Sequence, residues 1–104
     1  MNVTIRRYES IDQSRKSELI KKVDEKLAPT LSELPGFNGY SVIDAGDGVV
    51  TSVSFFDTSA QAEESTRVAA SWLREQKLDA VLSTAPKITS GDVVVHKTRE
   101  LVQA

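Results

Sequence analysis

The sequence predicts an α+β domain with a four-stranded antiparallel sheet and two helices on one face of it. Three observations lead to this prediction. A glycine-rich turn joins two β-rich runs in mid-chain, helical periodicity flanks that hairpin on both sides, and a further β-rich run lies near each end. The order β-α-β-β-α-β is the ferredoxin-like split βαβ arrangement, with right-handed crossovers. At 104 residues, the chain has the length of one domain, 1–104.

The first strand is expected at the amino terminus. Val3 and Ile5 alternate there with more polar neighbours as far as Tyr8, and a period of two places successive side chains on opposite faces of a sheet. We expect the helices to cover one face, and the other face to carry Tyr8 and one alternating set from the hairpin. That second face needs a cover of its own, and a second copy of the chain is the simplest one. The sequence therefore predicts a homodimer.

A long amphipathic helix is expected over residues 12–34. Ser10 and Gln13 have the spacing of a capping box, and apolar side chains then recur at steps of three and four. Pro29 lies inside this stretch, has no N–H to donate, and places its ring against the preceding turn. The helix should therefore break or kink near Ala28.

A β-hairpin is expected from Pro35 to Asp57, followed by a second helix. Pro35 ends the helical pattern, and the turn at 44–48 contains glycines that reach positive φ at little cost. Thr58 and Gln61 then form another capping box. Small and aromatic side chains follow at helical spacing: Ala62, Ser65, Ala69, Trp72 and Gln76.

The last strand is expected from the β-branched run that begins at Ile88 and includes Val93, Val94 and Val95. Gly91 inside that run marks a bulge in this interpretation. Residues 99–104 form a polar tail that frays or reaches a neighbour.

Composition excludes several classes of function. Lys and Arg number 13 against 15 Asp and Glu, so no positive field attracts a nucleic acid. There is no cysteine, and one histidine with scattered carboxylates does not make a metal site. No apolar run reaches the roughly 20 residues of a membrane span, and Arg6 and Arg7 interrupt the apolar core that a leader needs. We expect a cytoplasmic protein with no nucleic-acid, membrane or metal partner.

The chain resembles the antibiotic biosynthesis monooxygenase-like proteins. The resemblance rests on Leu34–Phe37 at the end of the first helix, the turn Asp44–Gly48, and Trp72 on the second helix. It implies a dimeric α+β barrel with a small pocket in each subunit between sheet and helices. It also implies a cofactor-independent monooxygenase that acts on an electron-rich aromatic or quinone-type molecule. The alternative is a non-enzymatic dimer of the same fold that binds a small molecule or is structural.

Candidate site residues come from the chemistry of this pocket. Trp72 offers a flat apolar wall for an aromatic ligand, and the small side chains of Ser65 and Ala69 leave room beside it; packing in the core is the alternative. His96 is the only histidine and suits a general base, and Tyr40 suits a phenolic hydrogen bond to a substrate. Structural roles are the alternative for both.

The resemblance also bears on cofactors. Its oxygenases have an arginine at the pocket, which would be Arg67 or Arg74 here. Its haem-degrading branch has a histidine ligand where this chain has Leu82, ten residues after Trp72. Haem degradation is therefore not expected, and no cofactor is.

Overall fold

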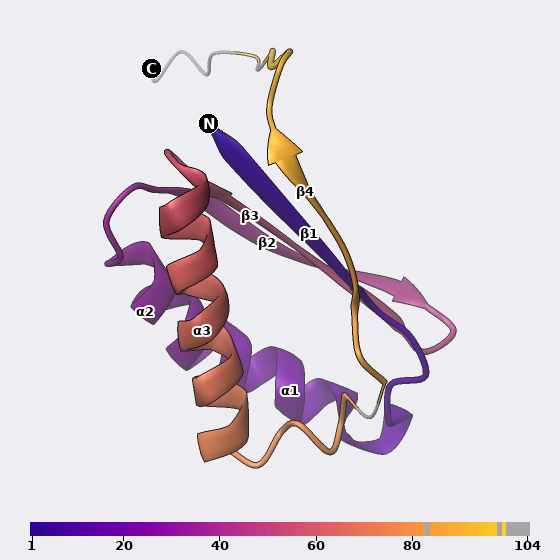
Figure 1. The fold of residues 1–104 in the computed structure, drawn as a ribbon. Coiled ribbons are helices and arrows are strands. Elements are labelled where there is room, and N and C mark those ends of the chain that lie inside the picture. The colour runs from indigo at the N-terminus through magenta and orange to yellow at the C-terminus, as the bar shows by residue number, and fades with distance from the viewer. Residues whose placement is uncertain (83, 98, 100–104) are drawn as a thin grey trace, which may run out of the picture.

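The computed structural model describes residues 1–82, 84–97 and 99, which form two layers, a sheet and a helical layer (Figure 1). The sheet contains β1 (Asn2–Tyr8), β2 (Phe37–Gly46), β3 (Val49–Phe56) and β4 (Lys87–Asp92). Its order is β2-β3-β1-β4, and every neighbouring pair is antiparallel. The helices all lie on one face. This is the predicted α+β, ferredoxin-like architecture.

The first helical segment is divided where proline predicts a break. It consists of a 3-10 turn η1 (Gln13–Arg15), α1 (Lys16–Lys22), a π-helical turn η2 (Val23–Leu27) and α2 (Ala28–Ser32). The Ala28 N–H donates to the Val23 carbonyl, five residues back. Pro29 lies in the first turn of α2, where a missing N–H costs nothing. The chain thus accommodates the proline by forming a π-helical turn, which is wider than an α-helical turn, just before it.

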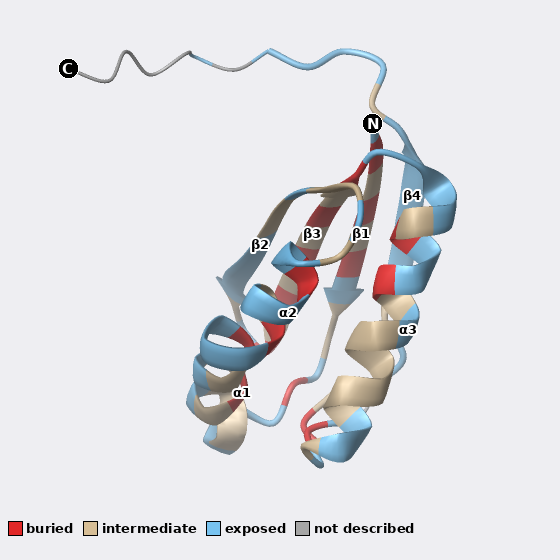
Figure 2. Ribbon diagram, turned by 90° about the vertical axis from the view of Figure 1, so that its left-hand side faces the viewer, coloured by how far each residue is buried: buried red, intermediate tan, exposed pale blue. Residues whose placement is uncertain are grey.

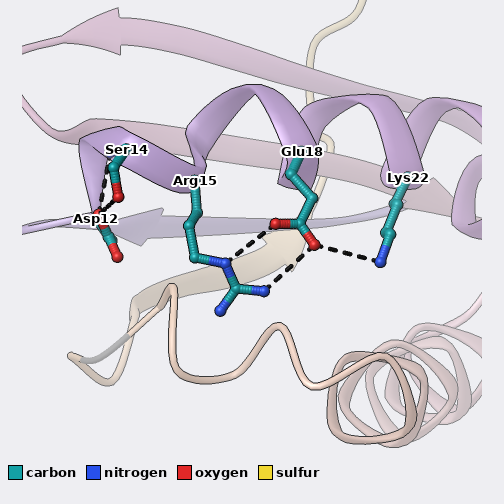
Figure 3. A network of polar contacts seen from close by, with 5 residues as sticks. All are labelled: Asp12, Ser14, Arg15, Glu18 and Lys22. Atoms are coloured by element: carbon teal, nitrogen blue, oxygen red, sulfur yellow. Dashed lines mark hydrogen bonds and ion pairs between the residues drawn. The ribbon is translucent and has the colours of Figure 1, made fainter.

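The amino-terminal cap of this segment differs from the prediction. Ser10 has a φ of 58° and caps nothing, so the expected capping box with Gln13 is wrong. Asp12 is the cap, and its carboxylate accepts from the Ser14 N–H at 3.0 Å and from the Ser14 hydroxyl at 2.6 Å (Figure 3). An aspartate one residue before the turn has the shorter reach to the free N–H groups.

A surface network follows this cap along α1. The Glu18 carboxylate pairs with the Arg15 guanidinium at 3.0 Å and with the Lys22 ammonium at 3.3 Å (Figure 3). The side chains of all three residues are between 35% and 40% exposed. Such solvated pairs contribute little to stability.

The hairpin forms as predicted. Its turn has positive φ at Gly46, Asp47 and Gly48, of 81°, 54° and 78°. The β2–β3 register shifts between Phe37 and Gly39 and again between Asp44 and Gly46. The glycines therefore accommodate both the tight turn and the bulge beside it.

The second helix, α3 (Ser59–Glu75), begins with the predicted capping box. The Gln61 N–H donates to the Thr58 hydroxyl at 3.2 Å, and the Thr58 N–H donates to the Gln61 side chain at 3.1 Å. After the helix ends, Leu78 and Val81 are fully buried in turns. They join the core that α1, η2 and α2 form with Val50 of β3.

The last strand is shorter than predicted. β4 ends at Asp92, and Val94 and Val95 beyond it are 89% and 83% exposed. Its partner β1 begins at Asn2, opposite Asp92, so the next residue pairs only through a Val93 N–H bond to the Met1 carbonyl. Gly91 pairs with Val3 in regular register and marks no bulge. Within the expected tail, Arg99 is exposed, and residues 100–104 lie outside the described part of the chain.

The two faces of the sheet differ in character (Figure 2). The inner face, beneath the helices, carries Asn2, Thr4, Arg6 and Tyr8 of β1 and their β3 partners Val50, Ser52, Ser54 and Phe56. The outer face carries Val3, Ile5, Val53 and Phe55, none of which is fully buried. Tyr8 was expected on the face away from the helices, and that expectation is wrong.

None of the helices in the described part of the chain combines the length and the apolar character that a membrane span requires.

Candidate functional site

A small cavity lies between the inner face and the helices. Its volume is about 50 Å³, and its walls are mostly aliphatic. η2 and the flanking helices contribute Leu19, Ile20, Val23, Leu27 and Leu31; α3 and the segment after it contribute Ser65, Ala69, Leu73 and Leu82. The sheet supplies the polar side chains of the floor, which are Arg6, Tyr8, Tyr40, Ser52 and Ser54.

Arg6 is the charged residue of this floor. It lies at the centre of the inner face, paired across the strands with Ser52 and Ile88, and it is only 7% exposed. Its guanidinium donates to the Thr66 hydroxyl of α3, and that hydroxyl donates in turn to the Ala62 carbonyl at 3.1 Å. Among the described residues, no ion pair involves Arg6. The described part of the chain therefore buries a cation without a carboxylate paired to it.

Ser54 adds an unpartnered hydroxyl to the floor. It is 2% exposed, and its Oγ has no hydrogen-bond partner in the described structure. It lies between Thr4 of β1 and Tyr40 of β2 in the register. Buried hydroxyls are ordinarily bonded, so a polar atom inside the cavity would satisfy this one.

Both tyrosines of the chain line the cavity as neutral phenols. Burial raises the pKa of Tyr40 to about 12, with a further increase from Tyr8, and the Arg6 charge opposes both effects. Burial also raises the pKa of Tyr8, and Arg6 again acts in the opposite direction. Near neutral pH, these phenols can donate hydrogen bonds but cannot act as bases.

Two open clefts adjoin the cavity on opposite sides. The arginine cleft, about 360 Å³, shares Arg6, Tyr8, Ala69, Leu73 and Leu82 with the cavity and continues past Arg74, Asp79, Pro86 and Ile88. The tyrosine cleft, about 310 Å³, shares Ile20, Val23, Tyr40 and Val42 with it and continues past Lys21, Asp24 and Ala28. Arg6 thus lies where the cavity meets one cleft, and Tyr40 where it meets the other.

The structure brings together only part of the predicted site. Ser65, Ala69 and Tyr40 line the cavity. Trp72 does not: it packs at the edge of the core and lines a shallow depression with Thr30 of α2 and other α3 residues. His96 is exposed in the segment after β4.

The structure separates the two arginines between which the sequence left the choice open. Arg74 lines the arginine cleft, whereas Arg67 pairs with Glu64 on the outer surface of α3. Sequence reasoning missed Arg6 and Ser54. The alternation in β1 placed Arg6 with Thr4 and Tyr8, which was the available signal, but it did not show that this set faces the helices.

The arrangement suits a ligand that carries negative charge. A buried guanidinium stabilises an oxyanion more strongly than a solvated one does, because little water screens it. Among the described residues, the cavity lining includes no carboxylate and no histidine, and Asp79 is the carboxylate that lines the arginine cleft. Within the described chain, no cluster of His, Asp and Glu could hold a metal ion.

Comparisons with known proteins identify the fold. No family model matches the chain, and no curated protein matches it either. Among solved structures, a protein of unknown function from Nitrosomonas europaea, NE2512, superposes with a TM-score of 0.75 at 17% identity over 95% of this chain and 94% of its own. The monooxygenase ActVA-Orf6 of Streptomyces coelicolor, in complex with nanaomycin D, gives 0.73 at 16% identity over 95% and 92%. The haem-degrader MhuD of Mycobacterium tuberculosis, with two haems bound, gives 0.64 at 18% identity over 94% and 100%.

Proposed function

This chain has the fold of the antibiotic biosynthesis monooxygenase-like proteins, and we propose that it is a cofactor-independent monooxygenase of an electron-rich aromatic molecule. The observation that carries the proposal is the buried Arg6 guanidinium, unpaired by any described carboxylate, at the mouth of an apolar cavity. A monooxygenase of this fold holds a polycyclic ligand, nanaomycin D. Binding without catalysis is the alternative function of the same site.

The proposed reaction needs few protein groups. The substrate is a phenol or its keto form, and loss of a proton to solvent water gives an enolate whose ring carbon passes electrons to dioxygen. One oxygen atom becomes a new carbonyl on that carbon, and the other leaves as water, so the substrate supplies all the electrons. Arg6 stabilises the enolate oxygen, Tyr8 and Tyr40 donate hydrogen bonds, and the aliphatic wall excludes water.

Haem does not fit this site. The single histidine of the chain, His96, is exposed after β4 and does not line the cavity, so the walls offer no imidazole to iron. Leu82 stands where the resemblance places the ligand, and it is a cavity wall. The proposed reaction therefore does not involve haem.

We also propose that two copies of the chain pair through the outer face. The support is its row of half-buried apolar side chains, together with Ile43, which is 48% exposed at its edge. In a dimer, each subunit keeps its own cavity under its own helices. A cytoplasmic location stays a prediction from the sequence.

The test is oxygen uptake with anthrone, whose enolate is an electron-rich aromatic. We expect one anthraquinone and one water for each dioxygen consumed, at a rate above that in buffer. Arg6→Gln should lower kcat about 100-fold or more, which is the usual cost of removing an oxyanion donor. Arg7→Gln removes the same charge from the other face of β1, away from the cavity, and should leave kcat unchanged. Oxygen uptake no faster than in buffer would refute the proposed enzymatic activity. Saturable binding of anthrone without turnover would favour the alternative, a protein that binds the ligand without catalysis.

A further inference from the structure

We propose that the ligand is a small aromatic acid, held with its ring in the arginine cleft and its ionised oxygens on Arg6 at the entrance to the inner cavity. This inference deepens the proposed function and rests on the same site, but it does not depend on oxygenation. It concerns what the site recognises.

The state of Arg6 argues for an anion. Taking a guanidinium out of water is costly, and proteins usually offset the cost with a carboxylate and several hydrogen bonds. In the described chain, Arg6 has one side-chain partner, the Thr66 hydroxyl, and a guanidinium has five N–H donors. Arg6 lines both the cavity and the arginine cleft, so a ligand at their junction can accept from its remaining donors. Their planar fork matches the two oxygens of a carboxylate.

Volume decides where the ring lies. A cavity of about 150 Å³ accommodates benzene, whereas the inner cavity here has about 50 Å³. The inner cavity therefore has room for water or for a polar substituent of the ligand. The unpartnered Ser54 hydroxyl can form a hydrogen bond with either. The arginine cleft has about 360 Å³ and apolar walls from Ala69, Ala70, Leu73 and Pro86, which suit one or two fused rings.

Charge distinguishes the two clefts. The arginine cleft is lined by two cationic side chains, Arg6 and Arg74, against one carboxylate, Asp79. The tyrosine cleft has Lys21 against Asp24, which balance, and both are solvent-exposed. Only the arginine cleft has a buried cation, so an anionic ligand enters there.

The absence of a base in the cavity lining points to the same class of ligand. Neither tyrosine is ionised near neutral pH, and neither a carboxylate nor a histidine lines the inner cavity. Among the described residues, the site therefore holds a negative charge but has no side chain that removes a proton, so the proton of the proposed oxidation leaves to solvent. A molecule that is already ionised in water meets this requirement.

The test is calorimetric titration with 2-naphthoate and with its neutral isostere 2-naphthamide. We expect the wild-type protein to bind the acid at least 10-fold more tightly than the amide, because charge-assisted hydrogen bonds exceed neutral ones. Arg6→Gln should reduce that ratio to about one, and Arg7→Gln should leave it unchanged. Thr66→Val removes the partner that orients the guanidinium and should lower the ratio several-fold.

The ratio separates recognition from folding, since a merely destabilised variant weakens both probes alike. Equal affinity for acid and amide, an unchanged ratio in Arg6→Gln, or no saturable binding of either probe would overturn the inference. Naphthoate has no hydroxyl to oxidise, so its binding is independent of the anthrone assay. If anthrone is not oxidised but naphthoate shows the expected ratio, the oxygenase fails and the acid subsite stands.

Discussion

The two faces of the sheet have exchanged their usual chemistry. The inner face, which the helices cover, buries Asn2, Thr4, Arg6, Ser52 and Ser54, each between 2% and 7% exposed. The outer face, which no described element covers, carries Val3, Ile5, Val53 and Phe55. A two-layer domain ordinarily places apolar residues beneath its helices and polar ones on the open side. The proposed ligand site on the inside and the proposed dimer interface on the outside would each account for one half of this reversal.

The reversal has a cost on each side. Buried hydroxyls and a buried guanidinium pack less favourably than aliphatic side chains, and an open apolar face invites association. The hydrophobic core offsets this loss of stability. It is formed by side chains of the helical layer and of the segment after α3 that are almost fully buried, namely Leu19, Leu27, Leu31, Leu78 and Val81. Leu78 and Val81 lie outside the cavity lining, whereas Leu19, Leu27 and Leu31 both pack in the core and form cavity walls.

The largest expected effect lies on the outer face. Val53→Lys places a charge at the centre of the proposed interface and should raise the dissociation constant of the dimer about a thousandfold or more, since an unpaired buried charge costs several kcal/mol. Sedimentation equilibrium measures this. Ser90→Lys adds the same charge to β4 at an exposed position and is the control. A wild-type protein that sediments as a monomer at all concentrations would remove the interface from the account.

The buried phenols should give the next largest effect. Because burial raises the pKa of Tyr40 to about 12, the folded state disfavours its ionisation relative to the unfolded state, whose tyrosines ionise near pH 10. Tyr40 thus contributes stability in full below about pH 10, and this contribution falls as pH rises towards 12, by about 2–3 kcal/mol. Urea unfolding and tyrosinate absorbance follow it. Ionisation of both tyrosines at the ordinary pH of about 10 would show that water reaches the inner face and that the phenols are not buried.

The smallest expected effect separates two buried serines. Ser54→Ala removes an unpartnered hydroxyl and should leave the free energy of unfolding unchanged or raise it by up to about 1 kcal/mol. Ser65→Ala removes a hydroxyl that donates to the Ala62 carbonyl at 2.6 Å, and should lower it by about 1 kcal/mol. Urea unfolding of both variants measures the difference. A loss of stability for Ser54→Ala would show that its hydroxyl already has a partner.

Local chemistry predicts much of this fold. The glycine turn, the Thr58 capping box and the disturbance around Pro29 depend on residues close in sequence, and each is confirmed in the structure. The end of β4 was not predictable in this way. β4 ends where its partner strand β1 begins, and the residue pattern within 88–95 contains no information about that partner.

The site was harder to predict because alternation does not say which face lies inside. Val3 and Ile5 are the apolar set of β1, so apolar residues would ordinarily be placed under the helices; here they face outward and Arg6 faces in. Trp72 drew attention as the only tryptophan, yet its helix turns it away from the cavity. Helical spacing placed Ser65 and Ala69 on one stripe, and both line the cavity.

The central claim is that the inner face keeps Arg6 for a ligand at the expense of stability, and Arg6→Met tests it most directly. Met retains much of the side-chain length without the charge. We expect a free energy of unfolding equal to that of the wild type or about 1–2 kcal/mol higher, as when buried ion pairs are replaced by apolar side chains. A loss of about 3 kcal/mol or more would show instead that Arg6 stabilises the fold and is not kept for a ligand.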